Sequence, residues 1–167
     1  GEKSVVGRTK TLPEGEIDQV QLAVVSCSNY EWGYFNPLAA LALRDSIDAV
    51  LHLGDYIYEY QISGYGDTTL GRTHDPAHEL ITLQDYRTRY AQYRSTAGFQ
   101  AVHQQHPFIT IWDDHEVSND SYVEGAENHQ AEEGDYTARR DAAKQAYYEW
   151  MPVRENNDLL YRSFSFG

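Results

Sequence analysis

Two short runs of metal-capable side chains stand out in this chain of 167 residues. Residues 53–59 read Leu-Gly-Asp-Tyr-Ile-Tyr-Glu, and residues 112–116 read Trp-Asp-Asp-His-Glu. Each run follows an apolar stretch that is typical of a β-strand. Ligands of open α/β sheets bind at the carboxyl ends of the strands, so we expect the two runs to meet there. Carboxylate and imidazole groups at that edge indicate a hydrolytic metal site.

The first run offers two candidate ligands. Gly54 lets the backbone turn sharply at the strand end, and Asp55 then points across the sheet edge. Tyr58 follows three residues later and could reach the same centre on a tight turn. A phenolate suits a hard trivalent ion, as in the tyrosine-ligated haem iron of catalase. The alternatives are an ordinary turn aspartate and a packing tyrosine, one of 14 in the chain.

Cys27, the one cysteine, ends the first apolar stretch. If that strand neighbours the one before Asp55, the thiol lies beside this carboxylate, and a metal would stabilise the thiolate. The alternative is a small buried apolar residue, as most free cysteines are. A single cysteine excludes an intrachain disulfide.

The second run is the densest cluster of ionisable groups. Four such residues in a row, from Asp113 through Asp114 and His115 to Glu116, are costly to crowd without a cation. His115 could act as a general acid, since imidazole titrates near neutral pH. The alternative is a solvated acidic loop.

A βαβ unit is predicted to position these residues. Residues 19–27 and 49–53 are short, β-branched apolar stretches, and a helix should start between them with Asn36 as N-cap and Pro37 in the first helical position. Strand, helix and strand within about 35 residues indicate a parallel, right-handed unit.

The rest of the chain is predicted to alternate helices and strands. Thr82 and Asp85 resemble a capping box that opens a helix with a tyrosine packing stripe. Further helices are expected over residues 98–106 and 136–150, and strands over 108–112 and 161–166. The stripe consists of Tyr86, Tyr90 and Tyr93.

Composition narrows the possible functions. An apolar fraction of 41% is typical of a globular domain. A formal net charge of -13 argues against nonspecific binding to nucleic acids or anionic membranes, which needs a basic surface. Bound cations would still allow an anionic substrate. No stretch is long enough for a transmembrane helix, and no signal peptide is visible.

These motifs, in this order, resemble the alkaline phosphatase D (PhoD-like) family of metallophosphoesterases. The similarity runs from about residue 22 to the end. It rests on Ser26-Cys27-Ser28-Asn29-Tyr30, Gly33-Tyr34-Phe35-Asn36, residues 51–60, Asp85-Tyr86-Arg87 with Arg89-Tyr90, residues 112–117 and residues 146–154.

The resemblance implies an α/β fold of the metallophosphoesterase type, a two-sheet β-sandwich flanked by helices, of which this chain would be the N-terminal half. Residues 1–18 would be a linker or the exit from a preceding β-rich domain, and residues 19–167 the N-terminal part of the catalytic domain. The class takes further metal ligands from its C-terminal half, which would be a partner of this chain.

The resemblance also implies the metals. Cys27, Asp55 and Tyr58 would hold Fe3+, and Asp55 would bridge to Ca2+ with Asp114 on the calcium side. His115 keeps the place of the catalytic histidine of the class. This chain departs from the pattern of the class at two positions. Asp114 replaces an asparagine metal ligand, and Cys27 lies where the class has an Asp-x-His motif. No residue is assigned to substrate binding.

The function implied is hydrolysis of phosphomonoesters or phosphodiesters by a metal-activated hydroxide, outside the cytoplasm or at the cell wall. Two alternatives stay open. One is a noncatalytic acidic domain that binds calcium or a protein partner, and the other is an inactive fragment of the enzyme.

Overall fold

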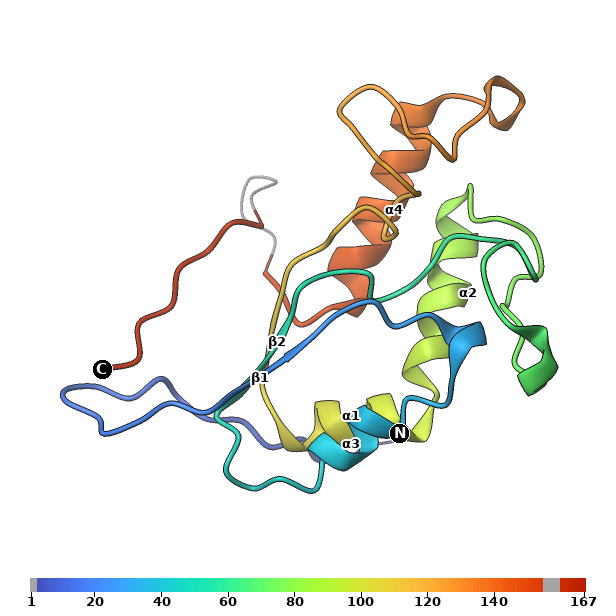
Figure 1. Cartoon of the computed structure of the whole chain (residues 1–167). Coiled ribbons are helices and arrows are strands. Elements are labelled where there is room, and N and C mark those ends of the chain that lie inside the picture. Colours follow the sequence, from blue (N-terminus) through green and yellow to red (C-terminus); the bar gives the residue numbers. More distant parts are fainter. Residues whose placement is uncertain (1–2, 155–159) are drawn as a thin grey trace.

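A three-stranded parallel sheet forms the centre of the molecule (Figure 1). The computed structural model describes residues 3–154 and 160–167. The strands are β1 (Leu22–Val25), β2 (Ala49–His52) and β3 (Phe108–Thr110), in the order β1-β2-β3. The register pairs Val25 with His52 and His52 with Thr110, so the three strands end level. The α/β class and the parallel pairing are confirmed, and this is the one sheet within the described ranges.

Helices pack in two pairs beside the sheet (Figure 1). The first pair is α1 (Asn36–Leu41) with α3 (Ala97–Gln105), and the second is α2 (Leu83–Arg94) with α4 (Tyr136–Trp150). Short 3-10 turns lie in the connections, namely η1 (Tyr30–Trp32), η2 (Thr68–Leu70) and η3 (Ala131–Glu133). No described helix is both long enough and apolar enough to cross a membrane.

The core between the sheet and the helices is rich in tyrosine. The predicted stripe of α2 is confirmed, because Tyr86, Tyr90 and Tyr93 are all fully buried. Two of its hydroxyls have backbone partners: Tyr86 donates to the carbonyl of Val117 over 2.6 Å, and Tyr93 accepts from the amide of Tyr30 over 2.9 Å. Hydrogen bonding of this kind offsets the cost of burying polar groups.

The start of α2 is predicted correctly and the start of α1 is one residue off. The Thr82 side chain accepts from the amide of Asp85, and the Asp85 carboxylate accepts from the amide of Thr82, which completes the capping box. In α1, Asn36 is already helical and Phe35 is the N-cap, with a φ of 57°. The Phe35 ring packs edge-on against Phe99 at 4.8 Å, so tertiary packing decides where this helix begins.

The predicted strand over residues 161–166 is wrong. This segment is extended but belongs to no sheet. Leu160 is buried and Phe164 half-exposed, and both lie over a face of the sheet that includes Leu51 and Ile109. The alternation of apolar and polar residues reflects this packing against a sheet face, with no neighbouring strand to pair with.

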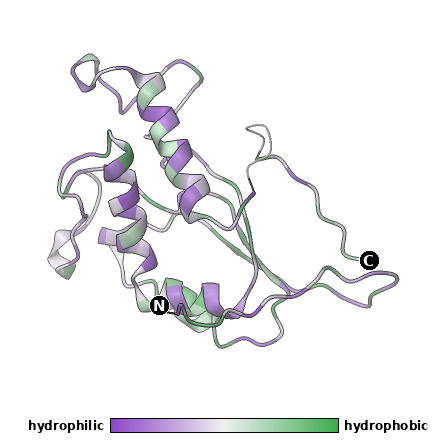
Figure 2. Cartoon of the chain, turned by 180° about the vertical axis from the view of Figure 1, so that it is seen from behind, coloured by the Kyte–Doolittle hydropathy of each residue, from purple (hydrophilic) through white to green (hydrophobic). Residues whose placement is uncertain are grey.

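That face of the sheet is only partly covered. Leu22, Val24 and Leu53 remain 41%, 60% and 52% exposed. Figure 2 shows hydrophobic residues along the central strands, whereas the helices alternate between hydrophobic and hydrophilic positions. These residues leave an exposed apolar surface on this face of the sheet.

His103 of α3 is a partly buried, neutral imidazole that packs against β3. Its ring stacks on Phe108 with centroids 3.8 Å apart, and its Nε2 accepts a hydrogen bond of 2.8 Å from Arg94. Burial, with the charge of Arg94, lowers the pKa of His103 from 6.5 to about 2. The unfolded chain therefore binds this proton at a higher pH than the folded chain does.

We expect the free energy of unfolding to fall as the pH goes from 7 to 5, because protons are taken up mainly by the unfolded state. A histidine with this shift accounts for about 2 kcal/mol at pH 5. His103→Gln keeps an acceptor for Arg94 without titrating, so urea unfolding should show a smaller fall in this variant. His78→Gln, at a side chain that is 68% exposed, is the control. Its free energy of unfolding should fall between pH 7 and 5 by as much as that of the wild type. An unchanged fall in His103→Gln would contradict this prediction.

Candidate metal centre

The turns after β2 and β3 touch each other at a glycine. Gly54 has a φ of +106°, a conformation that L side chains rarely adopt. A Cβ placed there would lie 2.6 Å from the Cβ of Asp113 and 2.8 Å from the carbonyl carbon of Trp112. Glycine is therefore required both by the backbone angle and by the close approach of the two turns.

A buried carboxylate, Glu116, joins the same two turns. It accepts hydrogen bonds from the amides of Asp55 over 3.1 Å, Tyr56 over 2.5 Å and Asp113 over 2.9 Å. Burial raises the pKa of Glu116 to about 7, although the amides of Tyr56 and Asp113 act to lower it. The sequence marked Glu116 as one of four crowded ionisable groups and did not reveal this structural role.

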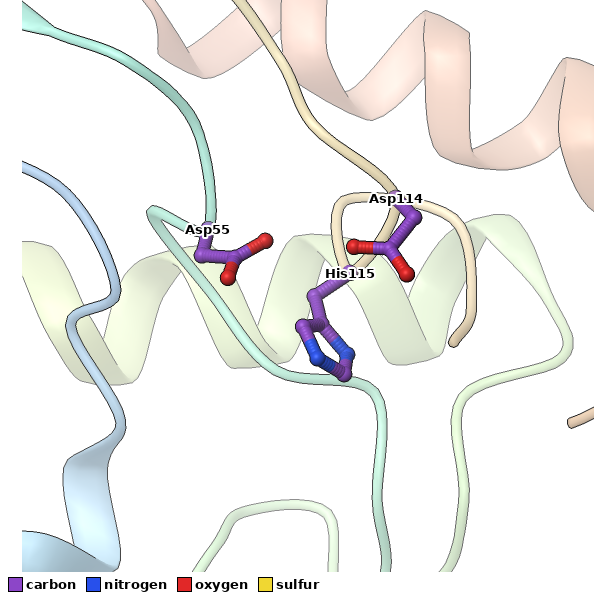
Figure 3. A group of neighbouring side chains, drawn as sticks. All are labelled: Asp55, Asp114 and His115. Carbon is purple, nitrogen blue, oxygen red and sulfur yellow. The ribbon is translucent and has the colours of Figure 1, made fainter. Parts of the chain in front are cut away.

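The joined turns bring three predicted residues into one group (Figure 3). Ligand atoms of Asp55, Asp114 and His115 all lie within 4.8 Å of one another. The buried Oδ1 of Asp55 has no hydrogen-bond partner among the residues that the structure describes. Burial raises the pKa of Asp55, and the charge of Asp114 adds to the effect. An unpaired buried oxygen beside a second carboxylate is costly for a protein alone, and a cation would satisfy both groups.

The side chains of Cys27 and Tyr58 both contact the other carboxylate oxygen of Asp55, Oδ2. The thiol of Cys27 lies 3.3 Å from Oδ2, and the hydroxyl of Tyr58 lies 3.1 Å from it. The amide of Cys27 donates to the carbonyl of Gly54 over 3.2 Å, so this neighbourhood follows from the pairing of β1 with β2. Cys27 is exposed, which excludes its alternative reading as a buried apolar residue.

The phenol of Tyr58 is held in its neutral form by its surroundings. Burial raises its pKa strongly, and the negative charge of Asp55 and the neighbouring Cys27 raise it further. A phenolate at this position therefore needs a cation nearby. Thiol, carboxylate and phenol are donors that iron accepts, and the three predicted residues contact one another at Oδ2 of Asp55.

His115 is oriented by a second buried carboxylate. Its Nδ1 lies 2.8 Å from Oε2 of Glu59, whose Oε1 accepts from the amide of Asn119 over 2.7 Å and from the side chain of Asn128 over 2.8 Å. The ring also stacks on Tyr58 with centroids 4.2 Å apart. Oε2 of Glu59 accepts the hydrogen bond from Nδ1, so Nδ1 carries a proton and Nε2 is left for a ligand or substrate.

The charge around His115 favours its protonated form. Burial by itself would lower the pKa of His115, but the hydrogen bond and charge of Glu59, followed by the charges of Asp55 and Asp114, raise it above its usual value. Sequence reasoning assigned no role to Glu59. The feature of the sequence that could have identified Glu59 is its position in the same run of metal-capable residues as Asp55.

A buried arginine of α2 supports the Tyr58 segment. Arg89 has no exposed surface and donates to the carbonyls of Tyr58, Tyr60 and Asp75. Sequence periodicity did not identify it, because it lies beside the tyrosine stripe, where an apolar residue is expected. The Arg89 side chain thus fixes the backbone that presents Tyr58 to Asp55.

Comparisons with known proteins identify the family of this chain. The family model described as PhoD-like phosphatase matches residues 22–167. Alkaline phosphatase D of Bacillus subtilis (strain 168) is 46% identical over 175 residues, an alignment that covers 99% of this chain and 30% of that protein. A solved structure described as a structure of PhoD superposes with a TM-score of 0.86 at 43% identity, covering 96% of this chain and 32% of that one. The chain belongs to the PhoD-like phosphatase family, and it spans about a third of the length of these relatives.

Gly54→Ala tests the contact between the turns. We expect it to lower the free energy of unfolding by about 3 kcal/mol, because alanine adds both backbone strain and a clash with Asp113. Gly134→Ala is the matched control, since Gly134 also has a positive φ, +97°, but an added Cβ would meet no atom within 4 Å. Gly134→Ala should lower the free energy of unfolding by about 1 kcal/mol, because it adds backbone strain but no clash. Equal losses in urea unfolding of the two variants would contradict the close approach.

Proposed function

We propose that this chain supplies the metal-holding part of a phosphoesterase active site that hydrolyses phosphomonoesters, phosphodiesters or both. The observation that carries the proposal is the unpaired Oδ1 of Asp55, buried beside Asp114 and His115 in a member of a phosphatase family. An anionic substrate at an acidic surface needs cations between the two, and these residues offer the ligands.

Two metals are part of the proposal. Cys27, Asp55 and Tyr58 would hold Fe3+, which suits thiolate and phenolate donors, and Asp114 would hold Ca2+, which prefers carboxylates. Asp55 would bridge them, and this is supported by the contacts of Oδ2 with Cys27 and Tyr58 and by the absence of a partner for Oδ1 among the described residues. When bound, such ions neutralise phosphate oxygens and lower the pKa of water.

The protein's own residues would orient the reaction. Glu59 keeps the Nδ1 proton of His115 in place, so Nε2 would be the atom that donates a proton to the leaving oxygen. Glu116 would hold the Asp55 and Asp113 turns at a fixed separation while the charge at the site changes.

The chain would act within a larger catalytic domain outside the cytoplasm or at the cell wall. In this proposal residues 1–18 are a linker from a preceding β-rich domain, and residues 19–167 are the N-terminal part of a two-sheet sandwich. The partly bare sheet face at Leu22, Val24 and Leu53 supports a second sheet at that position. The relatives, about three times as long, leave room for it.

Asp55→Asn should abolish metal binding and turnover in a protein that contains this chain and the remaining part of the catalytic domain. We expect kcat to fall by more than about 100-fold, since loss of a mere supporting partner of a metal ligand already costs about 10–100-fold. Asp45→Asn, at a carboxylate that is 92% exposed, is the control. Hydrolysis of a chromogenic phosphate ester and elemental analysis of metal give the two readouts. Full activity and full metal content in Asp55→Asn would contradict the proposal and favour a noncatalytic domain.

Iron held by a phenolate should colour the protein. We expect Fe3+ to produce a visible absorption band, and Tyr58→Phe to remove or shift it, because the phenolate would be the source of the charge transfer. Tyr60→Phe is the matched control: Tyr60 lies near His115, with ring centroids 5.5 Å apart, but Tyr58 is the tyrosine that contacts Asp55. A band that is the same in Tyr58→Phe would exclude Tyr58 as an iron ligand.

A further inference from the structure

A cavity of about 800 Å³ adjoins the candidate metal centre. Cys27 and Tyr58 form part of its wall, so it opens directly beside the donors that contact Asp55. The connection after β1, which includes η1, and the start of α1 form the remaining wall, and the loop that carries Tyr65 closes one side.

The wall of this cavity is aromatic and uncharged. Among the residues that the structure describes, the wall contains no Asp, Glu, Lys or Arg, although 23% of the chain is charged. Three of its rings are largely open to solvent, with exposed fractions of 56% for Trp32, 57% for Tyr34 and 52% for Tyr65. Large aromatic side chains left open around one cavity mark a binding surface for an apolar or aromatic group.

The rings form a row that begins at the metal centre. His115 stacks on Tyr58 at 4.2 Å, Tyr58 stacks on Tyr65 at 6.3 Å, and Tyr65 meets Trp32 edge-on at 6.2 Å. A ligand whose charged end reaches the group of Asp55, Asp114 and His115 would therefore lay its remaining part along Tyr65 and Trp32.

The loop that carries Tyr65 is fixed in place by buried polar groups. Asn29 donates to the carbonyl of Tyr65 over 2.8 Å. Glu31, which has no exposed surface, accepts from the amides of Ser63 and His74, each over 3.2 Å. The aromatic wall is thus formed before any ligand arrives, which lowers the entropic cost of binding.

A cation–π contact with Arg72 holds Tyr34, another ring of the cavity wall. The guanidinium of Arg72 lies 3.7 Å from the centre of the Tyr30 ring and 4.9 Å from that of Tyr34, and its Nε donates to the carbonyl of Tyr30 over 2.9 Å. Tyr34 donates in turn to the carbonyl of Leu70 over 2.8 Å. These contacts fix the ring of Tyr34 at the cavity.

We propose that this aromatic cavity binds the organic group of the phosphate ester and selects esters in which that group is a planar aromatic ring. The inference rests on the proposed phosphoesterase function and adds a substrate class to it. The absence of charge in the cavity wall leaves the phosphate to the metal centre, and the rings of Trp32 and Tyr65 offer stacking surfaces to the other end of the substrate. An aromatic ring that stacks there gains about 0.5–1.5 kcal/mol beyond the burial of its area.

The test compares two esters in a protein that contains this chain and the remaining part of the catalytic domain. For phenyl phosphate, Trp32→Ala and Tyr65→Ala should each raise KM about 5- to 20-fold with kcat nearly unchanged, since stacking and burial of the ring are lost. For glycerol phosphate, which has no ring, both constants should stay within about twofold. Tyr161→Ala, at a ring that is 80% exposed on another part of the surface, is the control and should change neither ester. Trp32→Phe keeps a ring and should have an intermediate KM.

A binding measurement separates this inference from the proposed function. Phenylphosphonate, which cannot be hydrolysed at its P–C bond, should quench tryptophan fluorescence in wild type but much less in Trp32→Phe, and methylphosphonate should have little effect. If wild type hydrolyses esters but Trp32→Ala and Tyr65→Ala leave the preference for phenyl phosphate unchanged, the cavity inference is wrong and the phosphoesterase proposal stands. If wild type binds phenylphosphonate at Trp32 but hydrolyses no ester, the phosphoesterase proposal is wrong and the aromatic site stands.

Discussion

The site depends on one buried carboxylate. Glu116 accepts hydrogen bonds from three backbone amides, two in the turn after β2 and one in the turn after β3. It thereby joins parts of the chain that are up to 61 positions apart in sequence. Hydrogen bonds to a charged group are stronger than neutral ones, and these three would be unsatisfied if the carboxylate were removed. Gly54 makes the arrangement possible, because no side chain keeps the two turns apart. The positions of Asp55, Asp114 and His115 follow from it.

The acidic residues of this region divide into two roles. Glu116 and Glu59 are fully buried and have their oxygens engaged by backbone amides and side-chain donors. Asp55 and Asp114 lie close together, and Oδ1 of Asp55 has no hydrogen-bond partner within the described part of the chain. The first pair builds the turns, and the second pair leaves negative charge where a cation can use it.

Much of the fold and part of the site could be predicted because the signals are local. The capping box at Thr82, the tyrosine stripe of α2 and the helix over residues 136–150 each follow from patterns within a few residues. The neighbourhood of Cys27 and Asp55 could be predicted because parallel pairing of β1 and β2 places their strand ends side by side. Family resemblance added the metals and the reaction, which remain proposals.

The contacts that could not be predicted join distant parts of the chain. The hydrogen-bond partners of Glu59, Glu116 and Arg89 are backbone groups or side chains that are distant in sequence. The residues next to these three give no indication of which partners they have. Residues 161–166 alternate like a strand but pack on a sheet face, and local pattern cannot separate these two cases. Phe35 starts α1 through packing against Phe99, which is equally invisible to local propensity.

The metal centre is tested most directly by anomalous X-ray diffraction from crystals, grown with Fe3+, of a protein that contains this chain and the remaining part of the catalytic domain. We expect a metal peak within about 2.0–2.4 Å of a carboxylate oxygen of Asp55, with Cys27 and Tyr58 around it and Glu116 still bound to the three amides. A well-ordered structure in which the ion lies elsewhere, and in which Oδ1 of Asp55 has found a donor from the protein, would contradict it.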